Sequence, residues 1–290
     1  MHIAVIGNAP NGSFETLRQV ADDSMQISFV PWGGLRARVG KQAGVDTDLE
    51  VPPDACLVRG MPRGSLEQVV FQMNLLARWE ASGVPVFNSP RALEIAIDKY
   101  LSLALIRQAG LAVPETVVTQ NVDDALRAFH ALGGDVVIKP VFGGEGRGLV
   151  RVTELEMARR CCQAIVNVGG VVFLQQFIEC QNSDMRLLVI GDHVFAMHRS
   201  NPLDWRTNAT RGAQCEAFHP SETLITMAKN AMQAVGCEMA GVDLIADRQG
   251  NVFVLEVNGV PGWKAIERVC QVDLPKCLLE YIKKSVISHE

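Results

Sequence analysis

The sequence predicts an α/β protein in two parts, and three observations lead to this fold class. Residues 1–90 alternate short apolar runs with helical patterns, which is typical of a parallel sheet covered by helices. Residues 90–290 add further strand-like runs and a hairpin pattern, which gives this part α+β character. No tandem repeat or charged tail interrupts the chain. We therefore expect an N-terminal parallel α/β domain over 1–89 and a second domain over 90–290.

The first ninety residues contain four strand-like runs and two helical patterns. The first run, IAVIG, is followed by polar turn residues, as expected of the first strand in such a sheet. The turn GNAPNG lacks the GxGxxG spacing of dinucleotide-binding proteins, which argues against a dinucleotide site. The other strands are predicted at Gln26–Pro31, Asp54–Arg59 and Val84–Phe87, and the helices at Phe14–Ala21 and Leu66–Ala81.

The second part begins with one long helical pattern, Arg91–Gln108, which stops at Gly110 and carries Asp98 and Lys99. The C-terminal third holds two further strand runs, a hairpin and a closing helix around Leu274–Val286. Between them lie a short strand after Val113–Thr116, a helix at Asp123–Ala131, a strand at Val136–Pro140, a glycine loop at Phe142–Gly148, a strand at Leu149–Val152, a helix at Glu154–Asn167 and a strand at Val171–Ile178.

Composition restricts the class of protein. The 290 residues carry a formal charge of -5, with 48% apolar and 20% charged residues. This balance is ordinary for a globular protein and argues against a nucleic-acid partner held mainly by phosphate attraction. No apolar run approaches the ~18 residues of a membrane span, and the start MHIAVIGNAPNG does not resemble a signal peptide. The eight cysteines show no CxxC spacing, so we expect free thiols and a cytoplasmic location.

The segment GVDLIADRQGNVFVLEVNGVPG carries the strongest chemical signal. Side chains two apart in a strand share a face, so Glu256 and Asn258 point the same way. A hairpin turn at Asp247–Asn251 would bring Asp243 opposite them. Polar capping of strand ends is the alternative, but Glu256 lies inside an apolar run where an unpaired carboxylate is costly. Because these oxygen ligands suit magnesium, the segment predicts a metal site.

Two lysines offer the complementary charge for phosphate. Lys139 ends an apolar strand, where it is either a phosphate ligand or a lysine whose ammonium reaches solvent. The loop after it, with Gly143, Gly144 and Gly146, lets backbone N–H groups cover phosphates, although a flexible turn is the alternative. Together with Lys99 and the metal site, this indicates an ATP-dependent enzyme.

Two further segments have both a functional and an ordinary interpretation. The strand end at Gln176, Phe177 and Ile178 is either a hinge that borders an adenine ring or an ordinary core strand. Arginine forks match carboxylate and phosphate oxygens, yet a solvated basic face would also explain the arginines. Arg186 and Arg199 flank apolar strand runs, which weakens that alternative. The arginine-rich segment contains Asp184, Arg186, Arg199, Arg206, Asn208 and Arg211.

Six motifs in order make the chain similar to a known family. They are DKYLSLALIRQAGLAVPET, VVIKPVFGGEGRGLVRV, FLQQFI, DMRLLVIGDHVFAMHR, WRTNATRG and AGVDLIADRQGNVFVLEVNGVPG, and the similarity runs over about residues 54 to 270. The chain resembles the ATP-grasp superfamily and, within it, the RimK-type α-L-glutamate ligases. It departs from that pattern at Gln176, where relatives commonly carry an acid, and at Gly144-Glu145, where they often show Ser-Gln.

The resemblance implies an ADP-forming carboxylate–amine ligase that works through an acylphosphate. It implies a lid subdomain over about 98–176 and a metal-binding part over about 177–290. By resemblance, Lys99 and Lys139 contact phosphate and the glycine loop closes over them, while the adenine lies against Gln176, Phe177 and Ile178 and the ribose side against Asp184. Arg206 and Asn208 make catalytic contacts, and the substrate contacts belong to Arg186, Arg199 and Arg211. Two magnesium ions, with manganese as an alternative, are implied on Asp243, Glu256 and Asn258, with Glu256 bridging them.

The substrates and partners remain alternatives at this stage. The resemblance implies an amino acid, glutamate first, and a small-molecule or peptide carboxylate acceptor. One rival is a ligase with a different amine, similar to glutathione synthetase or to the lysine-biosynthesis ligases. Another is a nucleotide-binding regulatory protein without catalysis, which would not need the whole metal set. Relatives often form dimers or tetramers, so a homo-oligomer is one option.

Overall fold

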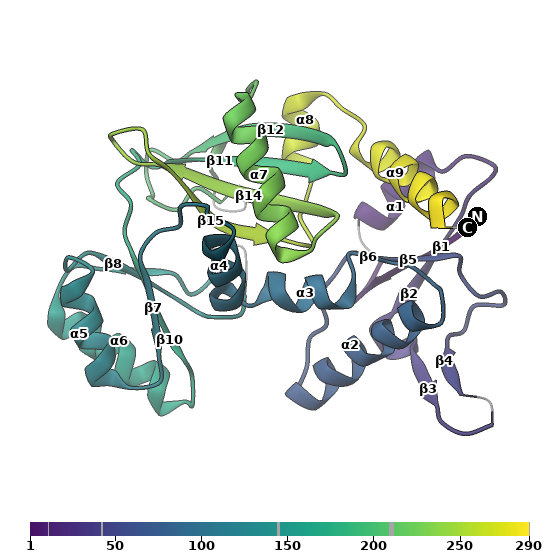
Figure 1. The fold of residues 1–290 in the computed structure, drawn as a ribbon, viewed down its shortest axis with the longest axis horizontal. Helices are drawn as coiled ribbons and strands as arrows, with labels where there is room; N and C mark the ends of the chain where they lie inside the picture. Colours follow the sequence, from purple (N-terminus) through teal and green to yellow (C-terminus); the bar gives the residue numbers. More distant parts are fainter. Residues whose placement is uncertain (11, 42, 144–145, 209–211, 290) are drawn as a thin grey trace.

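The computed structural model describes residues 1–289, apart from residues 11, 42, 144–145 and 209–211. Within these residues the strands form one parallel sheet, two antiparallel sheets and a short two-stranded ribbon. Figure 1 shows the sheets and their helices distributed along the long axis of the molecule. This combination of a parallel N-terminal sheet with antiparallel sheets confirms the predicted fold class.

The N-terminal sheet is parallel and is covered by helices on both faces. Its elements are β1 (His2–Gly7), α1 (Gly12–Val20), β2 (Gln26–Pro31), β5 (Ala55–Val58), α2 (Leu66–Ala81) and β6 (Val86–Phe87). The strand order is β2-β1-β5-β6. Alternate residues of β1 pack to opposite sides: Ile3 with the apolar face of α1, and Ala4 with that of α2. Burial on both faces explains why these strands are short apolar runs, and all four predicted strands are confirmed.

A small ribbon between β2 and β5 did not emerge from the sequence. It consists of β3 (Arg36–Arg38) and β4 (Gly44–Asp46) and follows a 3₁₀ turn at Trp32–Gly34. Arg38 and Asp46 form an ion pair across it at 2.6 Å. Strands of three exposed or half-exposed residues carry no apolar alternation, so periodicity cannot detect them.

The prediction of one helix over Arg91–Gln108 is wrong, because the structure contains two. They are α3 (Pro90–Ile97) and α4 (Lys99–Gln108), and the chain changes direction at Asp98. The Asp98 backbone is extended, and its carboxylate accepts hydrogen bonds from the N–H groups of Tyr100 and Leu101 at 2.9 and 3.0 Å. Asp98 therefore caps the second helix, and this capping places Lys99 at the start of α4.

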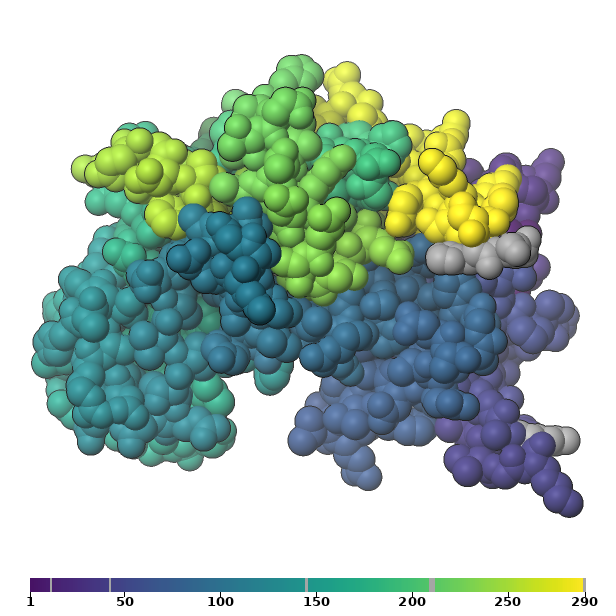
Figure 2. Space-filling view, in the orientation of Figure 1, coloured from purple at the N-terminus to yellow at the C-terminus, as the bar shows by residue number. Residues whose placement is uncertain are grey.

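The first antiparallel sheet forms a separate lobe, at the lower left of Figure 1. Its strand order is β7-β10-β8-β9, and α5 and α6 pack on one face through Phe129 and Cys162. In Figure 2 an open notch separates this lobe from the N-terminal sheet. The elements are β7 (Thr116–Thr119), α5 (Val122–Ala131), β8 (Val136–Lys139), β9 (Val150–Val152), α6 (Leu155–Asn167) and β10 (Val172–Gln176).

The second antiparallel sheet lies at the centre of the molecule. Its strands run in the order β13-β12-β11-β14-β15. Leu187 packs toward α4 and α7, whereas Leu188 packs toward α8 and α9, so both faces are covered. The elements are β11 (Ser183–Ile190), β12 (His193–Ser200), β13 (Gln214–Ala217), α7 (Glu222–Val235), β14 (Met239–Ala246), β15 (Val252–Asn258), α8 (Lys264–Cys270) and α9 (Leu274–His289).

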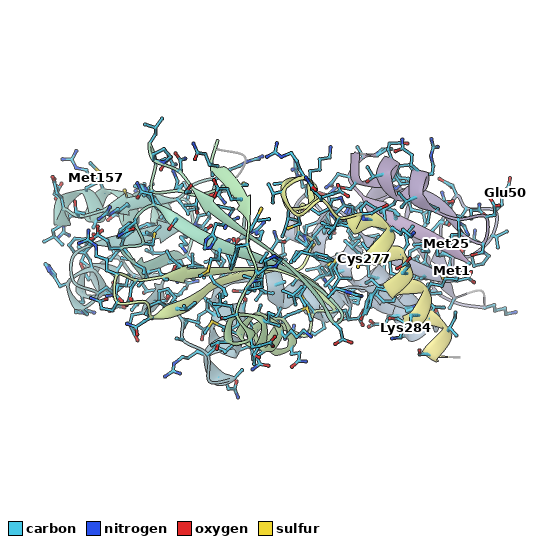
Figure 3. All side chains as sticks on the ribbon, turned by 90° about the horizontal axis from the view of Figure 1, so that it is seen from above. Met1, Met25, Glu50, Met157, Cys277 and Lys284 are labelled. Atoms are coloured by element: carbon cyan, nitrogen blue, oxygen red, sulfur yellow. The ribbon has the colours of Figure 1, made fainter. Side chains whose placement is uncertain are left out.

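The last helix returns the chain to its beginning. Figure 3, seen from above, shows Cys277 and Lys284 on α9 close to Met1 and Met25. Lys283 donates a hydrogen bond to Ser24 at 2.9 Å, and Cys277, Met1 and Met25 pack against one apolar cluster. Among the helices of the described residues, none combines the length and apolar character that crossing a membrane requires.

Asn88 joins the N-terminal sheet to the central sheet. Its side chain is almost fully buried, and its amide nitrogen donates to the carbonyls of Met239 and Gly259, both at 2.7 Å. Its amide oxygen accepts from the N–H groups of Glu238 and Met239 at 2.7 and 2.9 Å. One side chain thus satisfies four backbone groups from two segments more than 100 residues away in the chain.

Replacing Asn88 by alanine is expected to destabilise the protein by about 2–3 kcal/mol, because it leaves buried backbone groups without partners. Urea denaturation measures the change in the free energy of unfolding. Asn74→Ala, on the exposed side of α2, is the matched control and is expected to change it by less than about 0.5 kcal/mol. Equal stability of both variants would contradict the joining role.

Candidate functional site

A pocket lies between the two antiparallel sheets and contains most of the predicted site residues. It encloses about 900 Å³, part of which is open to solvent. The first sheet contributes cations and the glycine loop, and the central sheet contributes a charged face. The predicted residues that line it are Lys99, Lys139, Gly143, Gly146, Gln176, Phe177, Ile178, Asp184, Arg199, Arg206, Asn208, Asp243 and Glu256.

Two described residues among those predicted do not line the pocket, and two more predicted residues are not described. Arg186 lies behind Asp243 and bonds to its carboxylate. Asn258 ends β15, and its side-chain oxygen accepts the N–H of Val260 at 3.0 Å. Gly144 and Arg211 fall outside the described residues.

The two lysines come from separate elements and meet at the glycine loop. Lys99 donates to the carbonyls of Val141 and Gly143, so the start of α4 is bonded to that loop. Lys139 ends β8 and donates to the Gln175 side-chain oxygen at 2.6 Å. Burial lowers the pKa of Lys99, and it lowers that of Lys139 to about 8 even though Glu256 acts in the opposite direction on both. Both ammonium groups would therefore gain from a bound anion.

The glycine loop joins β8 to β9, which pair as a hairpin. Gly143 and Gly146 both have positive φ, at 129° and 67°, a conformation that side chains disfavour. The described part of the loop thus requires glycine for its backbone path. Its described residues that line the pocket are Gly143, Gly146 and Arg147.

The predicted hinge at the end of β10 presents three backbone N–H groups, from Gln176, Phe177 and Ile178. The N–H of Gln176 donates to Glu115 at 2.9 Å, and that of Phe177 donates to Asp135 at 3.0 Å. Among the described residues the N–H of Ile178 has no hydrogen-bond partner, so it is the donor that this hinge leaves available to a ligand. Gln175, which was not predicted as a site residue, is buried and links Lys139 to Thr116.

The charged face of the central sheet follows from strand register. Alternation places Asp184 and Arg186 of β11 on one face, and antiparallel pairing sets Arg199 opposite Asp184. The neighbouring pairings set Asp243 opposite Arg186 and Glu256 opposite Asp243. Further along β11 the same face carries Leu188 and Ile190, which pack in the core, so only the pocket end is charged.

These side chains form a row of alternating charge. Arg199 contacts Asp184 at 2.5 Å and Asp243 at 3.0 Å, and Arg186 contacts Asp243 at 2.6 Å. Arg186 also lies 3.9 Å from Glu256. The carboxylates held by these two arginines are thus those of the protein itself. The predicted contacts of Arg186 and Arg199 with substrate stay predictions.

The pKa values show how strongly the row is coupled. Burial by itself raises the pKa of Asp243, but Arg186 and Arg199 outweigh burial and hold this pKa at about 2. Burial raises the pKa of Asp184, against the influence of Arg199. The pKa of Arg199 is raised because the two carboxylates outweigh its burial. Asp243 is therefore an anion at every physiological pH, and it is the central charge of the row.

A metal could bind at the β14–β15 end of this row. No group of three or more His, Cys, Asp or Glu side chains in the described part of the chain is placed to hold a metal. Asp243 and Glu256 oppose each other, and 35% of the Glu256 side chain is exposed at the pocket. Two carboxylates with the Asn258 amide fit magnesium, which takes its remaining ligands from water and phosphate oxygens. Gly241 is closely packed here, since a Cβ on it would lie 3.1 Å from Pro261.

The loop at 205–208 closes the opposite side of the pocket. Thr207 donates to Asp184 at 2.5 Å, which ties the loop to the charged row. Arg206 holds the carboxylate of Asp204 at 2.6 Å, and Trp205 makes an edge contact with Phe177. Trp205 and Thr207 were not predicted as site residues. Their position in sequence beside Arg206 and Asn208 was the feature that could have indicated them.

Comparisons with known proteins find similar sequences and a similar fold. A family model described as a RimK-like ATP-grasp domain matches residues 96–282. The chain is 33% identical over 259 residues to a tetrahydromethanopterin:alpha-L-glutamate ligase of Methanosarcina acetivorans, covering 79% of this chain and 80% of that protein. It is 32% identical over 229 residues to a probable alpha-L-glutamate ligase of Mannheimia succiniciproducens, covering 78% and 76%. A structure of the ATP-grasp ligase PsnB with a phosphomimetic variant of a minimal precursor, Mg and ADP has a TM-score of 0.74 at 26% identity, covering 99% and 98%.

Proposed function

Because this chain belongs to the RimK-like ATP-grasp family, we propose that it is an ADP-forming ligase that joins an amino acid, L-glutamate first, to an acceptor carboxylate. The family and the resemblance that the motifs indicated are confirmed, and the chain is a ligase of the ATP-grasp fold. One observation carries the proposal: a single pocket sets Lys99 and Lys139 opposite Asp243 and Glu256. A triphosphate with a divalent cation has the charge pattern that suits these two walls.

The relatives support the choice of substrates. One relative is named tetrahydromethanopterin:alpha-L-glutamate ligase, and another is named probable alpha-L-glutamate ligase. We propose glutamate as the amine for this reason. The acceptor is a small-molecule carboxylate, with a peptide carboxylate as the alternative that the PsnB complex suggests. We also propose the division into 1–89, a lid at about 98–176 and a metal-binding part at about 177–290.

The proposed reaction has two steps. An oxygen of the acceptor carboxylate attacks the γ-phosphorus of ATP, and ADP leaves, which forms an acylphosphate. The amine of glutamate then attacks the acyl carbon, loses a proton and expels phosphate, leaving an amide. In this reaction the protein positions the reacting groups and neutralises charge, and it does not supply a nucleophile.

Each wall of the pocket has a task in this reaction. Lys99 and Lys139 hold phosphate oxygens, and the glycine loop covers them and excludes water. The Ile178 N–H and the carbonyls of Gln176 and Phe177 face the adenine edge, and Asp184 lies on the ribose side. Arg206 and Asn208 contact the transferring phosphoryl group, while Arg186 and Arg199 orient Asp243. Asp243, Glu256 and Asn258 hold two magnesium ions, which supply charge neutralisation for the phosphates when bound.

The decisive experiment measures ADP release with Mg-ATP and glutamate across a panel of small carboxylates and carboxyl-terminal peptides. Mass spectrometry should find a product heavier by one glutamyl residue. If another amino acid supports release and glutamate does not, the amine assignment is wrong and the ligase assignment stands. Tight Mg-ATP binding without release on any pair would favour the regulatory alternative.

ATP use is expected to weaken at alkaline pH through Lys139. Its pKa of about 8 in the free protein means that the ammonium form, which phosphate prefers, is lost as pH rises above 8. The KM for ATP should be constant below pH 8 and rise by up to about tenfold per pH unit above it. Lys139→Arg keeps its charge and should flatten this rise. A wild-type KM as constant as that of the variant up to pH 9.5 would contradict the phosphate contact.

A further inference from the structure

The N-terminal sheet contains a topological switch point that the proposed reaction does not use. From β1 the chain passes through α1 to β2 on one side, and it later continues from β5 through α2 to β6 on the other. The carboxyl ends of the adjacent parallel strands β1 and β5 meet there, at Gly7 and at Arg59-Gly60. A Cβ on Gly60 would lie 3.5 Å from the backbone nitrogen of Asn8, so the two ends approach closely. Open α/β sheets bind ligands at such points.

Arg59 places a charge without a counter-ion at this point. Its side chain is 7% exposed and donates one hydrogen bond, from Nη2 to the carbonyl of Pro261 at 2.7 Å. The guanidinium lies 3.9 Å over the ring of Trp263, and its Nε and Nη1 have no hydrogen-bond partner among the residues that the structure describes. Burial alone lowers the pKa of Arg59 to about 9, and no carboxylate acts against it. A buried guanidinium in this state is unfavourable unless an anion joins it.

A second cation borders the same point from the central part of the molecule. Lys264 begins α8, and its ammonium lies against Gly12, the first residue of α1. Among the described residues Lys264 has no ion pair. Burial raises the pKa of Glu267, three residues along, and the charge of Lys264 acts in the opposite direction. The start of a helix attracts anions, so a cation facing it lacks a favourable partner. An anion between them would serve both groups.

We propose that this switch point is an anion-binding site that takes a carboxylate or phosphate of the acceptor, separate from the carboxylate that reacts. The site consists of the ends of β1 and β5, the start of α1 and the segment Pro261–Lys264. The Nε–H and Nη1–H groups of Arg59 lie on different edges of the guanidinium, and each can donate to one oxygen of a bound anion. This inference rests on the proposed function for the identity of the ligand, but not for the presence of the site.

The chain path connects this site to the reacting centre. Pro261 follows Asn258 by three residues, so the distance between them is at most about 10 Å. Glu256, two residues before Asn258, lines the main pocket. The acceptor is therefore a molecule with a second anionic group besides the carboxylate that reacts.

The first test titrates the full chain with sodium phosphate and with sodium glutarate, with saturating Mg-ADP present and sodium chloride at equal ionic strength as the reference. Isothermal calorimetry gives the dissociation constants, and the stronger of the two anions identifies the group. Arg59→Gln should raise the dissociation constant by at least about tenfold, and Lys264→Gln by about three- to tenfold. Arg63→Gln removes the same charge from an exposed arginine four residues away and should leave it within about twofold.

The outcomes separate the site from the ligase assignment. Unchanged anion binding in Arg59→Gln overturns the site whether or not any acceptor supports ADP release. If Arg59→Gln does not fold, Lys264→Gln decides, because its side chain is exposed; unchanged affinity there overturns the site. Once an acceptor is known, Arg59→Gln should raise the KM for the acceptor by at least about tenfold and leave the KM for ATP within about twofold. A general structural defect would move both values.

Discussion

Replacing Glu256 by glutamine is expected to abolish turnover and to leave the protein folded. Glutamine keeps the shape of the side chain and removes its charge, which the proposed magnesium site requires. We expect the rate of ADP release to fall by about 1000-fold or more. The fold should tolerate the change, because 35% of the side chain is exposed and Arg186, at 3.9 Å, is its nearest ion-pair partner.

Three measurements decide this prediction. ADP release gives turnover, thermal unfolding tests the fold, and manganese binding followed by electron paramagnetic resonance reports the metal site without turnover. Glu216→Gln, on exposed β13 of the same sheet, removes the same charge away from the pocket and should behave as the wild type. Near-normal activity of Glu256→Gln would refute the bridging role of this carboxylate.

Removing the Asp243 side chain is expected to destabilise the protein by about 3–5 kcal/mol. Asp243 is buried and accepts hydrogen bonds from both Arg186 and Arg199. Asp243→Ala would leave the two guanidinium groups largely out of water with less negative charge beside them. This cost exceeds the usual effect of a point substitution, which is about 1 kcal/mol.

Urea denaturation of matched variants measures this effect. Asp192→Ala removes an exposed aspartate that lies 3.6 Å from Lys229 and should cost less than about 1 kcal/mol. In an Arg199→Met background the cost of Asp243→Ala should be smaller, because one of the two arginines that need the carboxylate is gone. Additive costs in the double variant would show that the charged row does not act as a unit.

Much of the fold could be predicted because the signals were local. Runs such as Ile3–Gly7 are buried strands, and the strands of the N-terminal sheet appear where apolar runs indicated them. The break at Asp98 was missed because one capping side chain decides it and the helical periodicity continues across it. The strand β13 and the helices α7 and α8 were also missed; the four residues of β13 and the seven of α8 carry too little periodicity.

The candidate site divides in the same way. The Asp243–Glu256 pair could be predicted because both residues belong to one hairpin, where register follows from a short turn. The partners of Asp243 could not, because β11 pairs with β14 across 57 residues of chain between Arg186 and Asp243. The sequence shows which groups are charged but not which of them share a buried space.

What the sequence by itself determined is the strands of the N-terminal sheet, the family motifs and the oxygen-ligand hairpin. Only the tertiary structure decided that Arg186 and Arg199 hold Asp243, and that Arg59 lies buried beneath Trp263 without a counter-ion. The physical reason is that burial and charge compensation depend on which distant segments meet. Arg59 and Pro261, for example, lie about 200 positions apart in the chain. Local patterns set the elements, whereas desolvation and ion pairing arise when those elements pack.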